Sequence, residues 1–378
     1  MTIPTIDLPL IDHHTHGVIP KDLDYKQFQQ AFSESYLPPP DGATEFQKPL
    51  GLAIRRFCPP ILDLEPHVSG ERYVERRLEL GATEVNRRFL RAGGFERLII
   101  DTGFKSDSIL NVEQMAEIAA VPANEVVRIE AVAEDVVRSG VDAAGFADSF
   151  RERLLSRSRD AIGLKTIVAY RTTFKVDQSR PAENDLAAAA GEWMKEIETT
   201  GKVRLTHPVL VRAALWTAGD ICRQRKFPLQ VHSGLGDDVY IHACDPSHFT
   251  DFIKSMQDWE VPITLLHNYP FIREAGWLSE IYRNVYLDTG VVQNYTGPSS
   301  ARIIQESLET AKFSKLLFST DAIGLSELYY LGSVLFRRGL KIALDQWLSD
   351  DFITLQDADE IIQSVAYGNA RRIYNLEA

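Results

Sequence analysis

The stretch Ile11-Asp12-His13-His14-Thr15-His16-Gly17 continues an apolar run that begins at Leu8. Because side chains alternate between the two faces of a β-strand, His14 and His16 point the same way and Thr15 points the opposite way. Two imidazoles on one face can hold one metal ion. A histidine cluster in a solvated loop is the alternative for an isolated His-x-His pair, and the rest of the chain decides between the two.

Short runs rich in leucine and β-branched residues alternate with longer helical patterns along almost the whole chain. Strands are expected at residues 8–11, 97–101, 126–132, 161–168, 227–232, 261–267, 285–288 and 316–319. Helices are expected at residues 112–120, 142–156, 183–198, 209–225, 246–257, 271–283, 299–311 and 325–339. Eight alternations predict an α/β fold, the (β/α)8 TIM barrel, with the reaction site at the C-terminal ends of the strands.

Two regions depart from this repeat. About 80 residues separate His16 from the second expected strand. An insertion after the first strand rises on the catalytic face of a barrel, so residues from about 18 to 95 are expected to form a helical insertion that covers the site or binds substrate. A contact between subunits is the alternative role. Residues 355–376 are expected to form C-terminal helices, so residues 1–378 are predicted to be one barrel domain.

Three more polar residues stand where expected strands end. His232 and His267 close the fifth and sixth expected strands, and Asp321 follows the eighth. Each of them alone is more typical of a cap or a loop hydrogen bond. Histidine nitrogen and aspartate oxygen are suited to a divalent transition ion. Together with His14 and His16, these residues predict a metal site at the mouth of the barrel with an open position for water.

The fourth expected strand contains Lys165, on the same face as Gly163 and Ile167. A lysine that points into a barrel mouth is costly unless it is neutralised, paired or modified. The set of His-x-His on strand one, lysine on four, histidine on five and six and aspartate on eight resembles the amidohydrolase superfamily. The amidohydrolase-2 type proteins, including domains fused to glutamine-synthetase-like domains, carry similar Leu-Lys-x-Ile-x-Ala-Tyr-Arg and Phe-Ser-Thr-Asp-Ala stretches. The resemblance covers nearly the whole chain.

The resemblance implies one or two divalent metal ions, with zinc as the favoured ion. The ligands it implies are, in chain order, His14, His16, Lys165, His232, His267 and Asp321. The first two histidines and the aspartate would hold one ion, and the other two histidines would hold the second. Lys165, as a carbamate formed with carbon dioxide, would bridge the two ions. A protonated lysine that orients the substrate beside a single ion is the alternative.

The mechanism that follows is hydrolysis by activated water. Metal coordination lowers the pKa of water from 15.7 to about 7, and Asp321 is expected to take up the proton and deliver it to the leaving group. His267 is predicted to act with Asp321 in catalysis. Four residues near the strand ends are predicted to bind substrate, and a structural role is the favoured alternative for all but the arginine: Tyr170, Arg171, Asp237 and Tyr269.

Arg171 points to the class of substrate. Its guanidinium offers a bidentate fork for a carboxylate, with a salt bridge as the alternative role, and Arg55 and Arg56 lie in the expected insertion. We therefore expect hydrolysis of a carbon–nitrogen bond in a small amide that carries a carboxylate. Lactone or ester hydrolysis is a close variant. A metal-dependent decarboxylase of the same branch is a second reading, although Lys165 favours hydrolysis because those decarboxylases generally lack it.

The composition limits the partners. The 378 residues carry a net charge of −12, which argues against nucleic acid and against an anionic membrane as partners. There is no apolar run of about 20 residues and no secretory leader pattern at the N-terminus. Three scattered cysteines fit a reducing compartment. We expect a cytoplasmic protein whose partners are a small-molecule substrate and a second copy of the chain in a homodimer.

Overall fold

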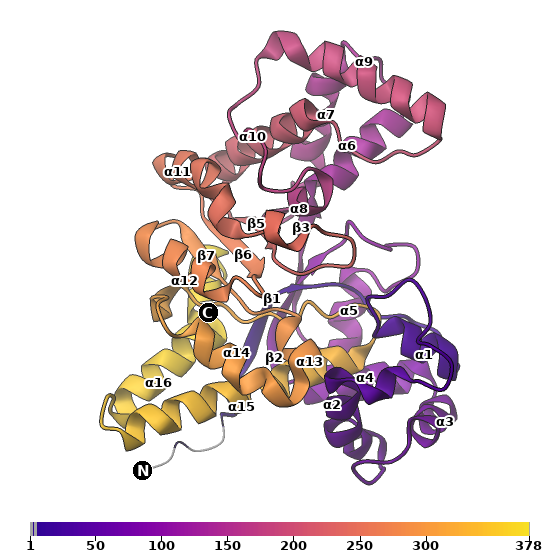
Figure 1. Ribbon diagram of the computed structural model, residues 1–378, viewed down its shortest axis with the longest axis vertical. Helices are drawn as coiled ribbons and strands as arrows, with labels where there is room; N and C mark the ends of the chain where they lie inside the picture. Colours follow the sequence, from indigo (N-terminus) through magenta and orange to yellow (C-terminus); the bar gives the residue numbers. More distant parts are fainter. Residues whose placement is uncertain (1–2, 4–5, 378) are drawn as a thin grey trace. The chain divides into compact units, whose positions relative to one another are not determined.

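The computed structural model describes residues 3 and 6–377, in which strands and helices alternate along most of the chain (Figure 1). The chain divides into two compact units. The first holds the described residues of Met1–Asn124 and Asp288–Arg371, and the second holds those of Glu125–Leu287 and Arg372–Ala378. Within the described residues, no helix has both the length and the apolar character needed to cross a membrane.

The first unit contains the beginning and most of the last quarter of the chain. Its strands are β1 (Leu10–Thr15) and β2 (Phe95–Asp101), and β3 begins at its boundary. Its α-helices are α1 (Tyr25–Ala31), α2 (Pro49–Phe57), α3 (Gly70–Leu80), α4 (Ala82–Ala92), α5 (Val112–Ala119), α13 (Val292–Thr296), α14 (Ser300–Ser307), α15 (Ser326–Ser349) and α16 (Leu355–Gln363). A π-helical turn (Ser364–Gly368) leads into α17 (Asn369–Ile373), which crosses the boundary between the units.

The second unit is a parallel α/β unit. Its strands are β3 (Ala123–Arg128), β4 (Gly163–Thr166), β5 (Leu229–Ser233), β6 (Ile263–His267) and β7 (Val285–Leu287). Its α-helices are α6 (Ile129–Arg138), α7 (Phe146–Arg157), α8 (Val168–Arg171), α9 (Glu183–Thr200), α10 (Pro208–Arg225), α11 (Thr250–Asp258) and α12 (Ile272–Ile281). In both units each strand pairs in parallel with a strand next to it in the sequence, as the repeat predicts.

The strands of the second unit are apolar along their length because they are buried on both faces. Leu229 is in register with Leu164 on one side and with Ile263 on the other, and Ile263 is in register with Val285. These four residues are fully buried. Parallel strands are covered by helices on both faces, so they favour continuous apolar runs over an alternating pattern. The predicted α/β class with parallel strands is therefore confirmed.

The eighth expected strand is irregular. Residues 316–319 do not form a regular strand, but the chain from Phe318 onward runs along β1. The amide of His13 donates to the carbonyl of Phe318 at 3.1 Å, and the amide of Asp321 donates to the carbonyl of His14 at 3.0 Å. Asp321 has a φ of 48°, a left-handed value that interrupts an extended strand. The position of this segment was predicted correctly, and its regular strand geometry was not.

The expected boundary of the third strand was wrong for an identifiable reason. The strand expected at 126–132 ends at Arg128, where α6 begins directly with Ile129. Val132 and Val136 of this helix are buried, so the helix adds apolar residues to the strand pattern and hides the boundary between the two. The C-terminal helices expected at 355–376 are present as α16 and α17, with a π-helical turn between them.

Residues between β1 and β2 form helices, as the sequence predicts, and α1 to α4 appear together in indigo and violet (Figure 1). Their core contains Phe28, whose ring centroid lies 5.7 Å from that of Tyr73. The hydroxyl of Tyr73 donates to Glu327 of α15 at 2.9 Å, and Arg77 donates to the same carboxylate at 2.6 Å. All three residues of this network are buried. The segment is therefore fastened to α15, and its expected role over the site stays a prediction.

The expectation of a single domain also stays a prediction. It concerned residues 1–378, of which the following lie outside the described residues: Met1, Thr2, Pro4, Thr5 and Ala378.

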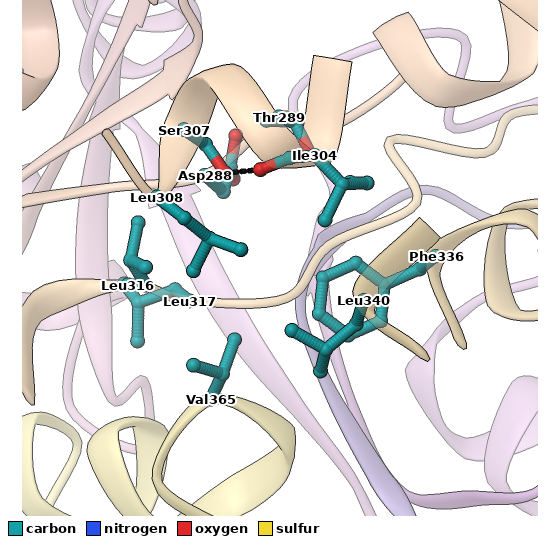
Figure 2. Close-up of a pocket in the computed structure, with 10 residues that line it drawn as sticks. All are labelled: Asp288, Thr289, Ile304, Ser307, Leu308, Leu316, Leu317, Phe336, Leu340 and Val365. Atoms are coloured by element: carbon teal, nitrogen blue, oxygen red, sulfur yellow. Dashed lines mark hydrogen bonds between the residues drawn. The ribbon is translucent and has the colours of Figure 1, made fainter. Parts of the chain in front are cut away.

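A small cavity lies in the apolar core of the first unit. Figure 2 shows side chains of α14, α15 and the segment before Phe318 pointing into it, among them Ile304, Leu316, Phe336 and Leu340. The cavity has a volume of about 10 Å³, which is roughly enough for one water molecule. Asp288 contributes to its lining, but His14, His16 and Asp321 do not. This cavity is a packing feature and is separate from the candidate ligands.

Phe336→Ala should lower the free energy of unfolding by about 3–5 kcal/mol, because it removes a buried ring and enlarges the existing cavity. The ring of Phe336 is 5% exposed and lies 4.7 Å from that of Phe318. Urea unfolding followed by circular dichroism measures the change. The control is Phe352→Ala, which truncates a residue that is 80% exposed and should shift stability by less than about 0.5 kcal/mol. Equal losses in both variants would contradict the prediction.

Candidate metal centre

Two histidines that were predicted as ligands stand on either side of Thr15, the last residue of β1. His14 and His16 are 0% and 6% exposed, and their ring centroids lie 5.3 Å apart. The Nδ1 atom of His16 lies 2.9 Å from the carbonyl oxygen of Asp101, the last residue of β2. Because a carbonyl oxygen can only accept a hydrogen bond, Nδ1 carries the proton and Nε2 keeps a lone pair that can bind a metal ion.

Asp321 brings a carboxylate to the same place. Its Oδ1 atom lies 3.2 Å from Nε2 of His14 and 3.6 Å from Nε2 of His16. One ligand atom from each of the three residues lies within 4.8 Å of the others. Two imidazole nitrogens and one carboxylate oxygen are a donor set that a divalent transition ion accepts. The residues present therefore fit a metal ion.

Buried hydrogen bonds hold the backbone around these ligands. The carboxylate of Asp12 accepts from the amide of Thr320 at 2.9 Å and also from its hydroxyl. Burial raises the pKa of Asp12 to about 8, although the hydrogen bonds from Thr320 lower it. The hydroxyl of Tyr329 in α15 donates to the backbone carbonyl of His16. Both contacts fix the direction in which the candidate ligands point.

His13 forms a second buried cluster on the other face of β1. Its Nε2 atom lies 2.6 Å from Oδ2 of Asp288, and the hydroxyl of Ser319 donates to the same oxygen at 2.7 Å. Neighbouring residues of a strand point to opposite faces, so His13 points away from His14, but the sequence did not identify its two partners. A carboxylate directly after the apolar run of the seventh strand was a signal that could have pointed to Asp288.

The second unit brings His232 and His267 together. Their ring centroids lie 4.7 Å apart in a T-shaped arrangement, and the ring of Tyr170 lies 4.6 Å from that of His232. The Nε2 atom of His232 lies 2.9 Å from the carbonyl oxygen of Leu235, so Nε2 carries the proton and Nδ1 is the atom that can bind a metal ion. Two of the predicted ligands of this unit are therefore adjacent.

Lys165 of β4 is 1% exposed and lies in register with Gln230 of β5. A charged ammonium so deeply buried is costly, which agrees with the expectation that the lysine is paired, neutral or modified. Its role as a metal ligand stays a prediction.

The predicted substrate-binding residues have different surroundings. The side chain of Arg171 is 8% exposed, and its Nη2 atom lies 3.0 Å from Oε1 of Glu134. Burial lowers the pKa of Arg171, although Glu134 and Glu130 raise it. This salt bridge gives the guanidinium a structural partner in its own unit. Tyr269 is half-buried and accepts a hydrogen bond at its backbone carbonyl from the amide of Leu235.

Asp237 is exposed in the loop after β5. Its predicted role and those of Tyr170, Arg171 and Tyr269 in binding substrate stay predictions.

The comparison with known families decides the class of protein. A family model described as Amidohydrolase matches residues 111–376, which are 266 of the 378 residues. The chain belongs to the amidohydrolase family. The matched range contains Lys165, His232, His267 and Asp321, whereas His14 and His16 precede it. The family predicted from the strand-end residues is confirmed.

A curated relative covers the N-terminal histidines as well. Protein fluG from Emericella nidulans is 27% identical over 409 residues, which include 97% of this chain and 46% of fluG. The chain therefore spans about half the length of this relative.

Solved structures show the same fold. A proposed metal-dependent hydrolase from Lactobacillus casei ATCC 334 matches with a TM-score of 0.83 at 24% identity, over 98% of this chain and 96% of that one. A uronate isomerase from Thermotoga maritima matches with a TM-score of 0.64 at 13% identity, over 97% and 95% of the two chains. The parallel α/β architecture is thus consistent with the barrel of this family. Because a hydrolase and an isomerase share this fold, the fold alone does not specify the reaction.

His16→Ala should lower the metal content of the purified protein, because it removes the imidazole whose Nε2 is aimed at Asp321. Inductively coupled plasma mass spectrometry of protein from metal-supplemented cells measures this content. The control is His207→Ala, which removes a histidine that pairs with Glu192 and should leave the metal content unchanged. Equal metal content in the parent and in His16→Ala would exclude His16 as a ligand.

Proposed function

We propose that this chain is a metal-dependent hydrolase that cleaves the carbon–nitrogen bond of a small amide bearing a carboxylate. Its membership of the amidohydrolase family supports metal-dependent hydrolysis. The observation that carries the proposal is the convergence of His14, His16 and Asp321, whose ligand atoms lie within 4.8 Å of one another.

These three residues would hold a divalent ion, for which we propose zinc. A bound ion of this kind lowers the pKa of a water molecule from 15.7 to about 7 and polarises a carbonyl group. Asp321 has a second carboxylate oxygen besides Oδ1, and its side chain is 18% exposed. We propose that it accepts the proton from the attacking water and delivers it to the leaving nitrogen. His14 and His16 would serve as neutral ligands of the ion, and we propose that His267 acts with Asp321 in catalysis.

We further propose that His232 and His267 are ligands and that Lys165 bridges two ions as a carbamate. The contact between the two imidazole rings and the deep burial of the lysine support this version. Metal analysis separates the alternatives: two ions per chain in the parent and fewer in Lys165→Ala support the bridge, and one ion in both proteins excludes it.

Two other reactions could take place at a metal site of this kind. A metal-dependent decarboxylase would use the same donor types and release carbon dioxide. A lactone or ester hydrolase would use the same chemistry on a carbon–oxygen bond. The buried lysine favours hydrolysis over decarboxylation. The resemblance to domains fused to glutamine-synthetase-like domains favours an amide as the substrate. A homodimer and a cytoplasmic location are part of the proposal.

A substrate panel tests the reaction class. N-acyl amino acids, γ-glutamyl amides, lactones and neutral esters are incubated with the metal-loaded protein, with product and carbon dioxide measured in parallel. Release of amine from the carboxylate-bearing amides supports the proposal. Carbon dioxide release without amine would assign decarboxylation, and turnover of lactones alone would assign the ester branch.

Asp321→Asn should reduce turnover of the best substrate by about 100-fold or more, because the amide can still coordinate weakly but cannot accept a proton. Circular dichroism should show the same secondary structure as in the parent. Turnover within a few-fold of the parent would mean that a different group takes the proton.

A further inference from the structure

The loop after β2 begins beside the candidate ligand His16. Asp101 closes β2, and its carbonyl oxygen accepts from Nδ1 of His16 at 2.9 Å. Its carboxylate accepts from the amide of Gly103 at 2.8 Å. The first residues of the loop are thus fixed to the imidazole of His16 by hydrogen bonds to both parts of one aspartate.

The far end of the same loop is fixed to the chain just after His16. The amide of Leu110 donates to the carbonyl of Val18 at 2.9 Å. A Cβ atom on Gly17 would lie 2.1 Å from the carbonyl oxygen of Leu110, so only glycine allows the two segments to approach this closely. Within the loop, the amide of Ser108 donates to the carbonyl of Lys105 at 2.9 Å. Residues 102–110 are therefore held in place at both ends.

This loop presents an aromatic ring beside the ligand. The ring centroid of Phe104 lies 6.2 Å from that of His16, with an angle of 68° between the planes. Phe104 is 40% exposed, which leaves part of an apolar ring in solvent next to a metal-binding side chain. Binding sites for small molecules typically combine such aromatic surface with a few polar groups.

Lys105 supplies a positive charge at the same place. Its Nζ atom lies 5.0 Å from the centroid of the Phe104 ring, which is within the range of a cation–π contact. Across residues 3 and 6–377, no ion pair of 4.0 Å or less involves Lys105. An ammonium group without a carboxylate partner can take one from a ligand, whereas Arg171 is already paired with Glu134.

We propose that Phe104 and Lys105 form the substrate-recognition pair of this site, with Lys105 binding the carboxylate of the substrate and Phe104 contacting its apolar body. The inference rests on the proposed function, because it names the residues that would select a carboxylate-bearing amide. In this proposal the substrate carboxylate binds Lys105, in the loop that also orients His16, and not Arg171.

Equilibrium binding tests the pair independently of turnover. The probes are N-acetyl-L-leucine and N-(3-methylbutyl)acetamide, which share the apolar body and differ by the carboxylate. Calorimetric titration of the parent should show tighter binding of the carboxylate probe. Lys105→Met should raise the Kd of that probe about tenfold and leave the neutral probe unchanged, and Lys105→Arg should restore most of the affinity. Phe104→Ala should weaken both probes by several-fold.

Two variants serve as controls, Lys202→Met and Phe352→Ala, each of which changes an exposed residue. Neither should alter binding of the probes. The proposed pair is wrong if the parent binds neither probe, or if Lys105→Met binds both as the parent does. The binding experiment and the substrate panel test different proposals. If probe binding depends on Lys105 but no amide is cleaved, the proposed reaction is wrong and the recognition pair still stands.

Discussion

The candidate metal centre depends on the backbone pairing between β1 and the segment around Asp321. This pairing joins parts of the chain that are about 300 residues apart, and the Asp12–Thr320 contact spans 308 positions. Closing so long a loop costs entropy, although the cost grows only slowly with length. The hydrogen bond from the amide of Asp321 to the carbonyl of His14 sets the distance between carboxylate and imidazole. An ion would therefore meet donors that are already in position, with little reorganisation to offset its binding.

The sequence predicted the parallel α/β class because buried parallel strands are apolar along their whole length, and alternation with helices leaves few other folds. It predicted the donor set because His14, His16 and Asp321 follow apolar runs. It could not predict the irregular path of the chain at Asp321, where a left-handed residue breaks the expected strand. The boundary at Arg128 was missed because the strand and the following helix are both apolar on their buried sides, so the apolar pattern continues across the change of period.

Partners of charged side chains were the least predictable part of the site. The pairing of His13 with Asp288 and that of Arg171 with Glu134 each join residues from different elements, and local pattern contains no information about such pairs. Phe104 was likewise missed, since an aromatic residue in a loop has no periodic signal. The hydrogen bond between His16 and the carbonyl of Asp101 is made by the backbone, so no side-chain motif could have indicated it.

The buried network of Tyr73, Arg77 and Glu327 has a consequence for the evolution of the fold. α15 carries Glu327, which accepts hydrogen bonds from Tyr73 and Arg77 of α3, and two residues later Tyr329, whose hydroxyl donates to the backbone carbonyl of His16. Deleting those helices would leave the Glu327 carboxylate without its cation, a change that usually costs several kcal/mol. The helices between β1 and β2 therefore cannot be replaced by those of a relative unless α15 is replaced with them. A chimera has to carry α15 from the same parent, so the two segments are expected to be inherited as one unit.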